Sequence, residues 1–191
     1  VYDKAKEYYK LYSSFTPEAE ISTYIPVGGN LHRYCRVRDR YRTPVDEGIE
    51  FLAAAGYFLK ESKYTYMAAR LIMCAAVTPN WFEGPQCATP GSTWHHVCFT
   101  EGIMINAIAV AFSFLGNVFS HDALTLISTS VEKAYAVIEK CCNEKGYRDY
   151  MNQGIVGNSE RIQGAMLLYL LGNKSYKDEI ENSYKKQDNK K

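Results

Sequence analysis

The sequence lacks several features that would point directly to a class of protein. Its six cysteines form no CxxC pair and show no zinc-ligand spacing, so we assign neither a disulfide nor a metal site. No apolar run reaches the length of about 18 residues that a membrane-spanning helix needs. The 22 basic and 21 acidic residues leave a net charge of +1, which argues against a general nucleic-acid binder. We therefore expect no cofactor, no nucleic-acid partner and no membrane partner.

An initiator methionine and a signal peptide are also missing. Because residue 1 falls just before a helical pattern, we expect residues 1–191 to be a single helical domain cut from a longer protein, with any export signal outside it. The length of 191 residues is enough to bury a sizeable core. The polar tail at residues 186–191 is expected to fray.

Strand signals are almost absent, whereas apolar residues recur with helical spacing along most of the chain. Thr43-Pro44 and Ser120 are typical of helix starts, and Gly116 and Gly146 of helix ends. The sequence predicts helices over residues 2–12, 45–60, 63–77, 94–115, 121–143, 159–171 and 174–185.

The predicted helices alternate in character. Residues 45–60, 94–115 and 159–171 are apolar on nearly every side, which is typical of a helix buried all round, and the helices between them are amphipathic or polar. Stacked helical hairpins with an inner and an outer ring would produce this alternation. We predict an all-α fold, an α/α barrel in the form of an incomplete toroid. A plain helical bundle is the alternative, although it does not need alternating full burial.

This arrangement predicts where the function lies. If the inner helices run parallel, their N-termini meet at one rim, which is fed by segments 30–44, 81–96 and 147–158. These connections are the longest and the most chemically varied in the chain, whereas those at 61–62 and 172–173 are tight. We therefore expect the functional residues at the first rim.

The first of these segments concentrates positive charge in a nearly neutral chain. Arginine binds carboxylate or sulfate through two parallel hydrogen bonds, and helix N-termini also favour anions, so we expect an anionic ligand here. The alternative is that these arginines face solvent or pair with Asp39, Asp46 and Glu47. The candidate binding residues are Arg36, Arg38 and Arg40.

The other two segments carry indole, imidazole, phenol and amide groups. Both tryptophans of the chain lie in residues 81–96, beside the adjacent His95 and His96, which suggests stacking on a sugar. In the third segment, Tyr150 has no apolar periodicity around it, so a core role is less natural for it. The alternatives are that the two histidines are ordinary surface residues, and that the amide side chains of the third segment only stabilise the loop or cap the helix. The candidate binding residues are Trp81, Trp94, Tyr147, Arg148, Asn152 and Gln153.

A series of short motifs extends over residues 24–172. Its members are Arg36-Val37-Arg38-Asp39-Arg40 and the Ala-rich helix after it, Lys63-Tyr64, Ala68-Ala69-Arg70, Pro79-Asn80-Trp81, Thr93-Trp94-His95-His96 and Tyr150-Met151-Asn152-Gln153-Gly154. Together they resemble the helical domain of heparinase II/III-type polysaccharide lyases and their alginate-lyase relatives. The last two motifs resemble the two active-site stretches of that family.

The resemblance implies β-elimination at a uronic acid residue. In the family, a His or Asn at the start of an inner helix neutralises the uronate carboxylate, which acidifies the C5 proton, and a tyrosine acts as base, acid or both. These roles fall on His95, with His96 as the alternate, and on Tyr150, which follows His95 by 55 positions. A phenol titrates near pH 10, so Arg148 and the helix dipole would have to lower the pKa of Tyr150 for it to act as a base.

The chain departs from the family pattern in two ways. Many relatives have asparagine in place of His95 or His96, and the family active site is completed by a C-terminal β-sheet domain that no part of this chain resembles. We therefore expect an acidic polysaccharide or oligosaccharide as ligand, a missing β-sheet domain as partner, and little or no activity from this chain alone. Secretion or a periplasmic location follows if the lyase interpretation holds. A non-catalytic glycan-binding module and a helical scaffold for protein partners remain the alternatives.

Overall fold

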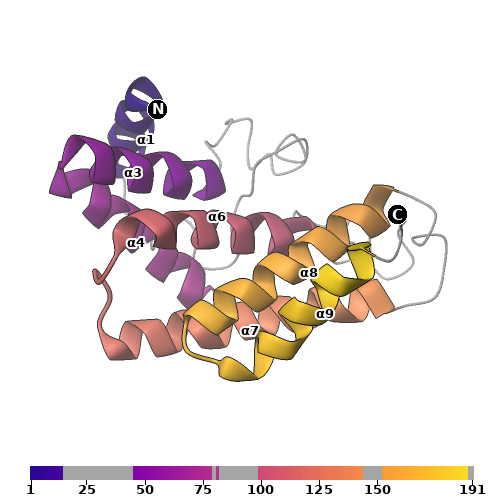
Figure 1. Ribbon diagram of the computed structural model, residues 1–191. Helices are drawn as coiled ribbons and strands as arrows, with labels where there is room; N and C mark the ends of the chain where they lie inside the picture. Colours follow the sequence, from indigo (N-terminus) through magenta and orange to yellow (C-terminus); the bar gives the residue numbers. More distant parts are fainter. Residues whose placement is uncertain (15–44, 79–80, 82–98, 144–151, 189–191) are drawn as a thin grey trace.

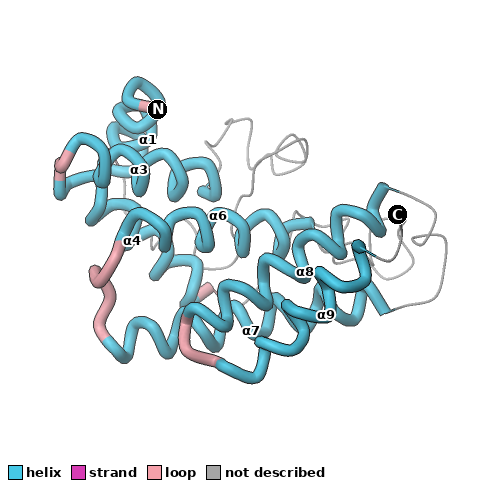
Figure 2. The backbone as a smooth tube through the Cα atoms, viewed as in Figure 1, coloured by secondary structure: helices cyan, strands magenta, loops and turns pink. Residues whose placement is uncertain are grey.

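The computed structural model describes residues 1–14, 45–78, 81, 99–143 and 152–188 (Figure 1). Within these ranges the chain forms helices and turns and contains no strand, which confirms the predicted all-α class; Figure 2 shows this composition along the backbone. The elements are α1 (Tyr2–Ser13), α3 (Val45–Leu59), α4 (Ser62–Val77), α6 (Phe99–Leu115), α7 (His121–Asn143), α8 (Asn152–Leu170), the 3-10 turn η3 (Lys174–Tyr176) and α9 (Lys177–Asp188).

Most of the predicted helix boundaries agree with the structure. Helices α1, α3, α4 and α7 each begin and end within one residue of the predicted range. Helix α6 ends at Leu115 as predicted, and the predicted start of this helix, residues 94–98, lies outside the described residues.

Helix α8 begins at Asn152, seven positions before the predicted start at residue 159. Gly154 and Gly157 indicated a loop, yet both lie inside the helix. A helical glycine costs only about 1 kcal/mol relative to alanine, which the packing of an adjoining apolar segment can offset.

The C-terminal prediction also needs a correction. The expected helix over residues 174–185 is divided into η3 and α9, and α9 continues to Asp188. The predicted frayed tail, residues 186–191, therefore overlaps the end of a helix. An ion pair of 3.8 Å between Lys177 and Glu181, four residues apart, supports the first turns of α9.

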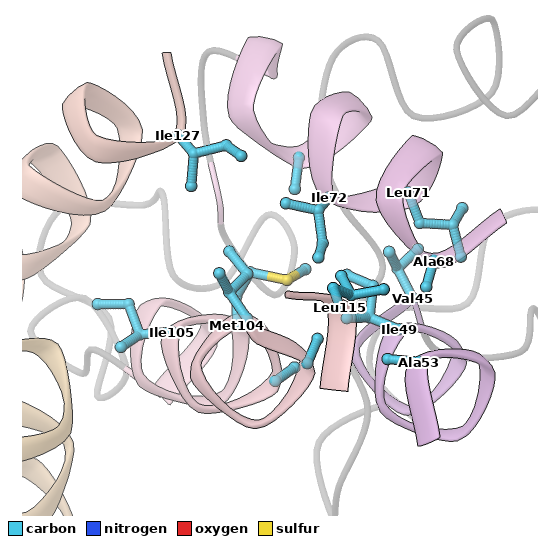
Figure 3. Packing of buried hydrophobic residues seen from close by; sticks show 14 of the residues in the cluster. Val45, Ile49, Ala53, Ala68, Leu71, Ile72, Met104, Ile105, Leu115 and Ile127 are labelled. Atoms are coloured by element: carbon cyan, nitrogen blue, oxygen red, sulfur yellow. The ribbon is translucent and has the colours of Figure 1, made fainter. Parts of the chain in front are cut away.

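Helices α3, α6 and α8 pack against one another in that order and form the central row of the fold (Figure 1). Helices α4 and α7 contact each other and cover this row, α1 packs against α3 and α4, and α9 lies on α8. Figure 3 shows buried side chains of the row and its cover meeting, among them Ile49, Ile72, Met104 and Ile127. Complete burial of one such side chain contributes about 1.5–3 kcal/mol to the free energy of unfolding.

The covering helices bury the faces that their periodicity predicted. In α4, the predicted inner face is buried at Tyr64, Met67, Ala68, Leu71, Ile72 and Ala75. In α7, Ile127, Val131, Ala134, Tyr135 and Ile138 are buried, while Leu124 is half-buried.

The prediction that residues 45–60 are buried on all sides was wrong at the C-terminal end of the helix. Tyr57, Phe58 and Leu59 are exposed, and 65% of the Phe58 surface is accessible. The rings of Tyr57 and Phe58 each lie 5.7 Å from the ring of Phe114 at the end of α6. Apolar composition alone does not distinguish a buried turn from the last, protruding turn of a helix.

Tight turns follow the C-terminal ends of the central row, as predicted. Gly116 and Gly172 have φ angles of 57° and 109°, the left-handed region that glycine enters without strain. Lys60 has φ 57° and holds its ammonium nitrogen 4.4 Å from the centre of the Tyr57 ring. The predicted cap at Ser120 is confirmed, because the amide of Ala123 donates to the Ser120 hydroxyl at 3.3 Å.

Candidate functional site

The helices of the central row run parallel. Glu50 of α3 meets Asn106 close to the middle of α6, and Tyr57 meets Phe114 near the C-terminal ends of both helices, so α3 and α6 point the same way. Glu160 and Gly164 of α8 lie against Gly102 and Ile105 of α6 in the same order. The N-terminal halves of α3, α6 and α8 therefore lie toward one side of the fold, which we call the N-terminal rim, and their C-terminal halves lie toward the other side, the C-terminal rim.

A tyrosine and several carboxylates meet where α1 packs on the start of α3. The hydroxyl of Tyr8 donates a hydrogen bond to Glu47, and the Tyr8 ring is fully buried, stacked 5.8 Å from Phe51. Burial raises the pKa of Tyr8, and the bond to Glu47 raises it further, so the phenol remains a donor at neutral pH. Asp46, directly beside Glu47, is only 5% exposed.

Glu50 stands one turn further along α3 and reaches across to α6. Its carboxylate accepts a hydrogen bond of 3.4 Å from the side-chain amide of Asn106. Burial raises the pKa of Glu50 above its ordinary value, and the charges of Asp46 and Glu47 raise it further. Glu50 therefore takes up a proton at a higher pH than an ordinary glutamate does.

The second buried carboxylate, after Asp46, is Glu160 in the middle of α8. It is 7% exposed, and its side chain occupies the space that the absence of a side chain at Gly102 leaves open. A Cβ atom at Gly102 would lie 1.9 Å from the Glu160 carboxyl carbon, so a side chain at this position would displace the Glu160 carboxylate from its buried place.

The described part of the N-terminal rim is consequently acidic. Buried carboxylates are stable only when hydrogen bonds or cations compensate them, and both Asp46 and Glu160 take part in further interactions. A polyanion would bind at this rim only if positive charge from neighbouring segments outweighed these groups. Among the described residues no group of three or more histidine, cysteine or carboxylate side chains could hold a metal ion. Nor does any helix in those ranges have the length and apolarity to cross a bilayer.

Most of the predicted site residues lie outside the described residues: Arg36, Arg38, Arg40, Trp94, His95, His96, Tyr147, Arg148 and Tyr150. Asn152 and Gln153 form the first turn of α8, and their side chains are likewise outside the description. In the sequence, His96 precedes the first described residue of α6 by three positions, and Tyr150 precedes α8 by two.

Trp81 is the predicted binding residue whose side chain the structure does describe. It is 7% exposed, and its indole nitrogen donates a hydrogen bond of 3.0 Å to the carbonyl oxygen of Ala75 in α4. A ring placed in this way packs against the core and offers no open face for a sugar. Its placement favours a structural role.

Sequence reasoning missed the carboxylates of the rim. Asp46 and Glu47 were named as alternative partners of the arginines, and Glu160 was not singled out. The available signal was the position of Glu160, which lies four residues before the buried Gly164 and so shares its face of the helix. The contact between Tyr8 and Glu47 joins positions 39 apart and has no sequence signature.

Comparisons of the chain with protein-family models, with curated proteins and with solved structures gave no match. The resemblance to heparinase II/III-type lyases rests on the short motifs described above.

Proposed function

We propose that this chain is the helical part of a polysaccharide lyase that acts on a uronate polymer, and that its hairpins form an arc of an α/α barrel. The observation that supports the proposal is the parallel direction of α3, α6 and α8. The lyase interpretation requires these helices to start at the same rim, because the histidines lead into α6 and the tyrosine leads into α8.

Chain connectivity limits how far the proposed catalytic groups can be from this rim. Four residues of extended chain span at most about 14 Å, so His95 cannot be far from the start of α6. Tyr150, two positions before Asn152, is held still closer to the start of α8. Gly102, near the start of α6, packs against Glu160, which lies eight residues after the first residue of α8, so α8 begins about 12 Å before this contact.

In the proposed reaction, His95 or His96 pairs with the uronate carboxylate, which stabilises the charge that develops when the C5–H bond breaks. Tyr150, as phenolate, takes the C5 proton. The electron pair of that bond forms the C4–C5 double bond as the C4–O bond breaks, and the departing oxygen receives a proton from the tyrosine. No oxidant or reductant is needed.

The acidic groups at the rim place a condition on this proposal. Asp46, Glu50 and Glu160 would repel a polyuronate, so the proposal assigns Arg36, Arg38, Arg40 and Arg148 to reverse the local charge. Binding should then weaken steeply with ionic strength, because exposed charge pairs are screened by salt.

The proposal is tested with the full-length gene product on heparan sulfate, alginate and other uronate polymers, with the unsaturated product followed by its ultraviolet absorbance. Removing the Tyr150 hydroxyl in Tyr150→Phe should lower the rate by at least about 100-fold, because a general acid–base group contributes that much or more. Folded protein that yields no unsaturated product from any of these polymers would refute the proposal.

A non-catalytic glycan-binding module is the second candidate, and a pocket of tyrosines and cations between α1 and α4, described below, favours it. The same Tyr150→Phe variant separates the two. A binding module would retain its affinity for the oligosaccharide in this variant, and neither protein would yield an unsaturated product.

A further inference from the structure

A pocket of about 580 Å³ opens between α1 and α4. None of its lining residues belongs to α3, α6 or α8, so it is separate from the groups of the central row. Two tyrosines, two cations and two serine hydroxyls contribute to the wall: Tyr9, Tyr66, Lys63, Arg70, Ser13 and Ser62. The volume is in the range typical of small-molecule sites, about 300–1,000 Å³.

The two tyrosines offer rings in different settings. Tyr66 is 67% exposed, so its ring is open to solvent. Tyr9 is half-buried, and its ring meets the buried ring of Tyr64 edge-to-face at 5.5 Å, which fixes its orientation. The Tyr9 ring is therefore held in place by its packing, while the Tyr66 ring is accessible to a ligand.

One positive charge of the pocket, that of Lys63, lies over the ring of Tyr9 and over the buried ring of Tyr64 behind it. The Lys63 ammonium group lies 5.9 Å from the centre of the Tyr9 ring and 4.8 Å from that of Tyr64. It also pairs with Glu61 at 2.5 Å, and this hydrogen bond raises the pKa of Lys63, which stays charged at neutral pH. An ammonium group has three donors, so Lys63 can keep Glu61 and still donate to a ligand oxygen. Arg70, which also takes part in an interaction within the protein, adds a guanidinium group that can form two parallel hydrogen bonds with a carboxylate or sulfate group.

We infer that this pocket binds an acidic sugar residue of an oligosaccharide, as a site distinct from the N-terminal rim. The tyrosine rings supply flat apolar area for the faces of the sugar ring, Lys63 and Arg70 supply the charge for a carboxylate or sulfate, and Ser13 and Ser62 supply hydroxyl groups for its hydroxyls. A simple anion would need the cations but not the rings, and a neutral sugar would need the rings but not the cations. The inference does not depend on the proposed lyase reaction, because no residue assigned to that reaction lines this pocket.

The test is a calorimetric titration of the 191-residue chain at low ionic strength with a hexamer of mannuronate. Two parallel titrations use reference ligands, a neutral hexamer of glucose in one and sodium sulfate in the other. Tyr66→Ala and Lys63→Gln remove the exposed ring and the charge, and both side chains are largely exposed, so the fold should be retained. The matched controls are Tyr57→Ala, an exposed tyrosine outside the pocket, and Lys174→Gln, whose ammonium group lies 4.0 Å over the ring of Tyr169.

We expect the uronate hexamer to bind, and the Tyr66→Ala/Lys63→Gln double variant to bind it at least about tenfold more weakly, since a ring contact and a cation are both lost. The affinity of each control variant for the uronate hexamer should stay within about twofold of that of the unaltered chain, the scatter expected for surface changes without a ligand contact. The neutral hexamer and sulfate should each bind at least about tenfold more weakly than the uronate hexamer, because each lacks one of the two recognition elements.

The inference would be overturned if the double variant bound the uronate hexamer as tightly as the unaltered chain does. It would also be overturned if the unaltered chain bound either reference ligand as tightly as the uronate hexamer. A His95→Ala/His96→Ala variant separates this result from the proposed function. If binding is lost in the histidine variant and kept in Tyr66→Ala/Lys63→Gln, the pocket is excluded while the lyase proposal stands. If the pocket binds the uronate but the full-length gene product forms no unsaturated product, the lyase proposal fails and the pocket stands.

Discussion

The two rims of the central row differ in which side chains are buried and which are exposed. At the N-terminal rim, carboxylates are drawn into the protein: Asp46 and Glu160 are 5% and 7% exposed, and Glu47 and Glu50 accept hydrogen bonds from Tyr8 and Asn106. At the C-terminal rim, apolar rings are left outside, as at Tyr57 and Phe58. Helices α3 and α8 thus each bury a carboxylate in their N-terminal half and expose an apolar side chain, Phe58 and Leu170, at their C-terminal end.

The two kinds of side chain contribute differently to stability. Exposed rings at the ends of helices contribute little to the core, whereas a buried carboxylate costs free energy unless it is compensated. Buried charge that is held in place at some expense in stability is typical of functional sites. The N-terminal rim is accordingly the end at which we expect chemistry.

The largest effect is expected where α6 and α8 approach at Gly102. Alanine is intrinsically better than glycine in a helix by about 1 kcal/mol, but its Cβ would displace the buried Glu160 carboxylate. We expect Gly102→Ala to lower the free energy of unfolding by about 2–3 kcal/mol, as overpacked cores do. Urea denaturation measures the change.

The Glu160→Ala background supplies the control for that experiment, because removing the carboxylate opens space for the new methyl group. In this background Gly102→Ala should no longer destabilise the protein. The same loss in both backgrounds would show that contact with Glu160 is not the reason for glycine at this position.

The next effect is expected at Tyr8. Tyr8→Phe keeps the buried ring and removes the donor to Glu47, which should cost about 1.5 kcal/mol, the usual contribution of a hydrogen bond to a charged group. Tyr9→Phe, one position along α1, should change the free energy of unfolding by less than about 0.5 kcal/mol. Equal effects of the two variants would mean that the bond to Glu47 contributes nothing measurable.

A smaller, pH-dependent effect is expected at Glu50. The pKa of Glu50 in the folded state is raised above its ordinary value of 4.5. At a pH between 4.5 and the folded-state pKa, the folded state therefore binds more protons than the unfolded state. The free energy of unfolding therefore falls as the pH rises through this range. Above the range, the charged Glu50 carboxylate destabilises the folded state to its full extent. Glu50→Gln keeps an acceptor for Asn106 without the charge, so it should stabilise the protein at neutral pH and lose this advantage below pH 4.5. Thermal denaturation across this range checks the sign, and an advantage that persists below that pH would contradict the explanation.

The smallest effect is expected at the opposite rim. Phe58→Ser replaces a ring that is 65% exposed, so the free energy of unfolding should change by less than about 0.5 kcal/mol. A loss of 2 kcal/mol or more, the size typical of a buried Phe site, would show that the ring is part of the core and would remove the contrast between the rims.

Periodicity predicted the helices well because each element buries a continuous apolar face, as α4 and α7 do. It placed the start of α8 too late, because Gly154 and Gly157 indicate a loop locally while the helix continues through them. The indole of Trp81 was predicted to bind sugar, yet it donates to Ala75, a contact within the fold that composition cannot reveal. The acidic character of the N-terminal rim was also missed, because it depends on side chains from α1, α3, α6 and α8 that meet only in three dimensions.

The central claim is that this chain carries the histidine and tyrosine segments of a uronate-polysaccharide lyase at the N-terminal rim. The most direct measurement is the ultraviolet absorbance of products released from a panel of uronate polymers by the full-length gene product, compared with its Tyr150→Phe variant. The account predicts that absorbance rises with at least one polymer and that the variant loses at least about 99% of the rate. An unchanged rate in Tyr150→Phe, or no absorbance from any polymer with folded protein, would contradict it.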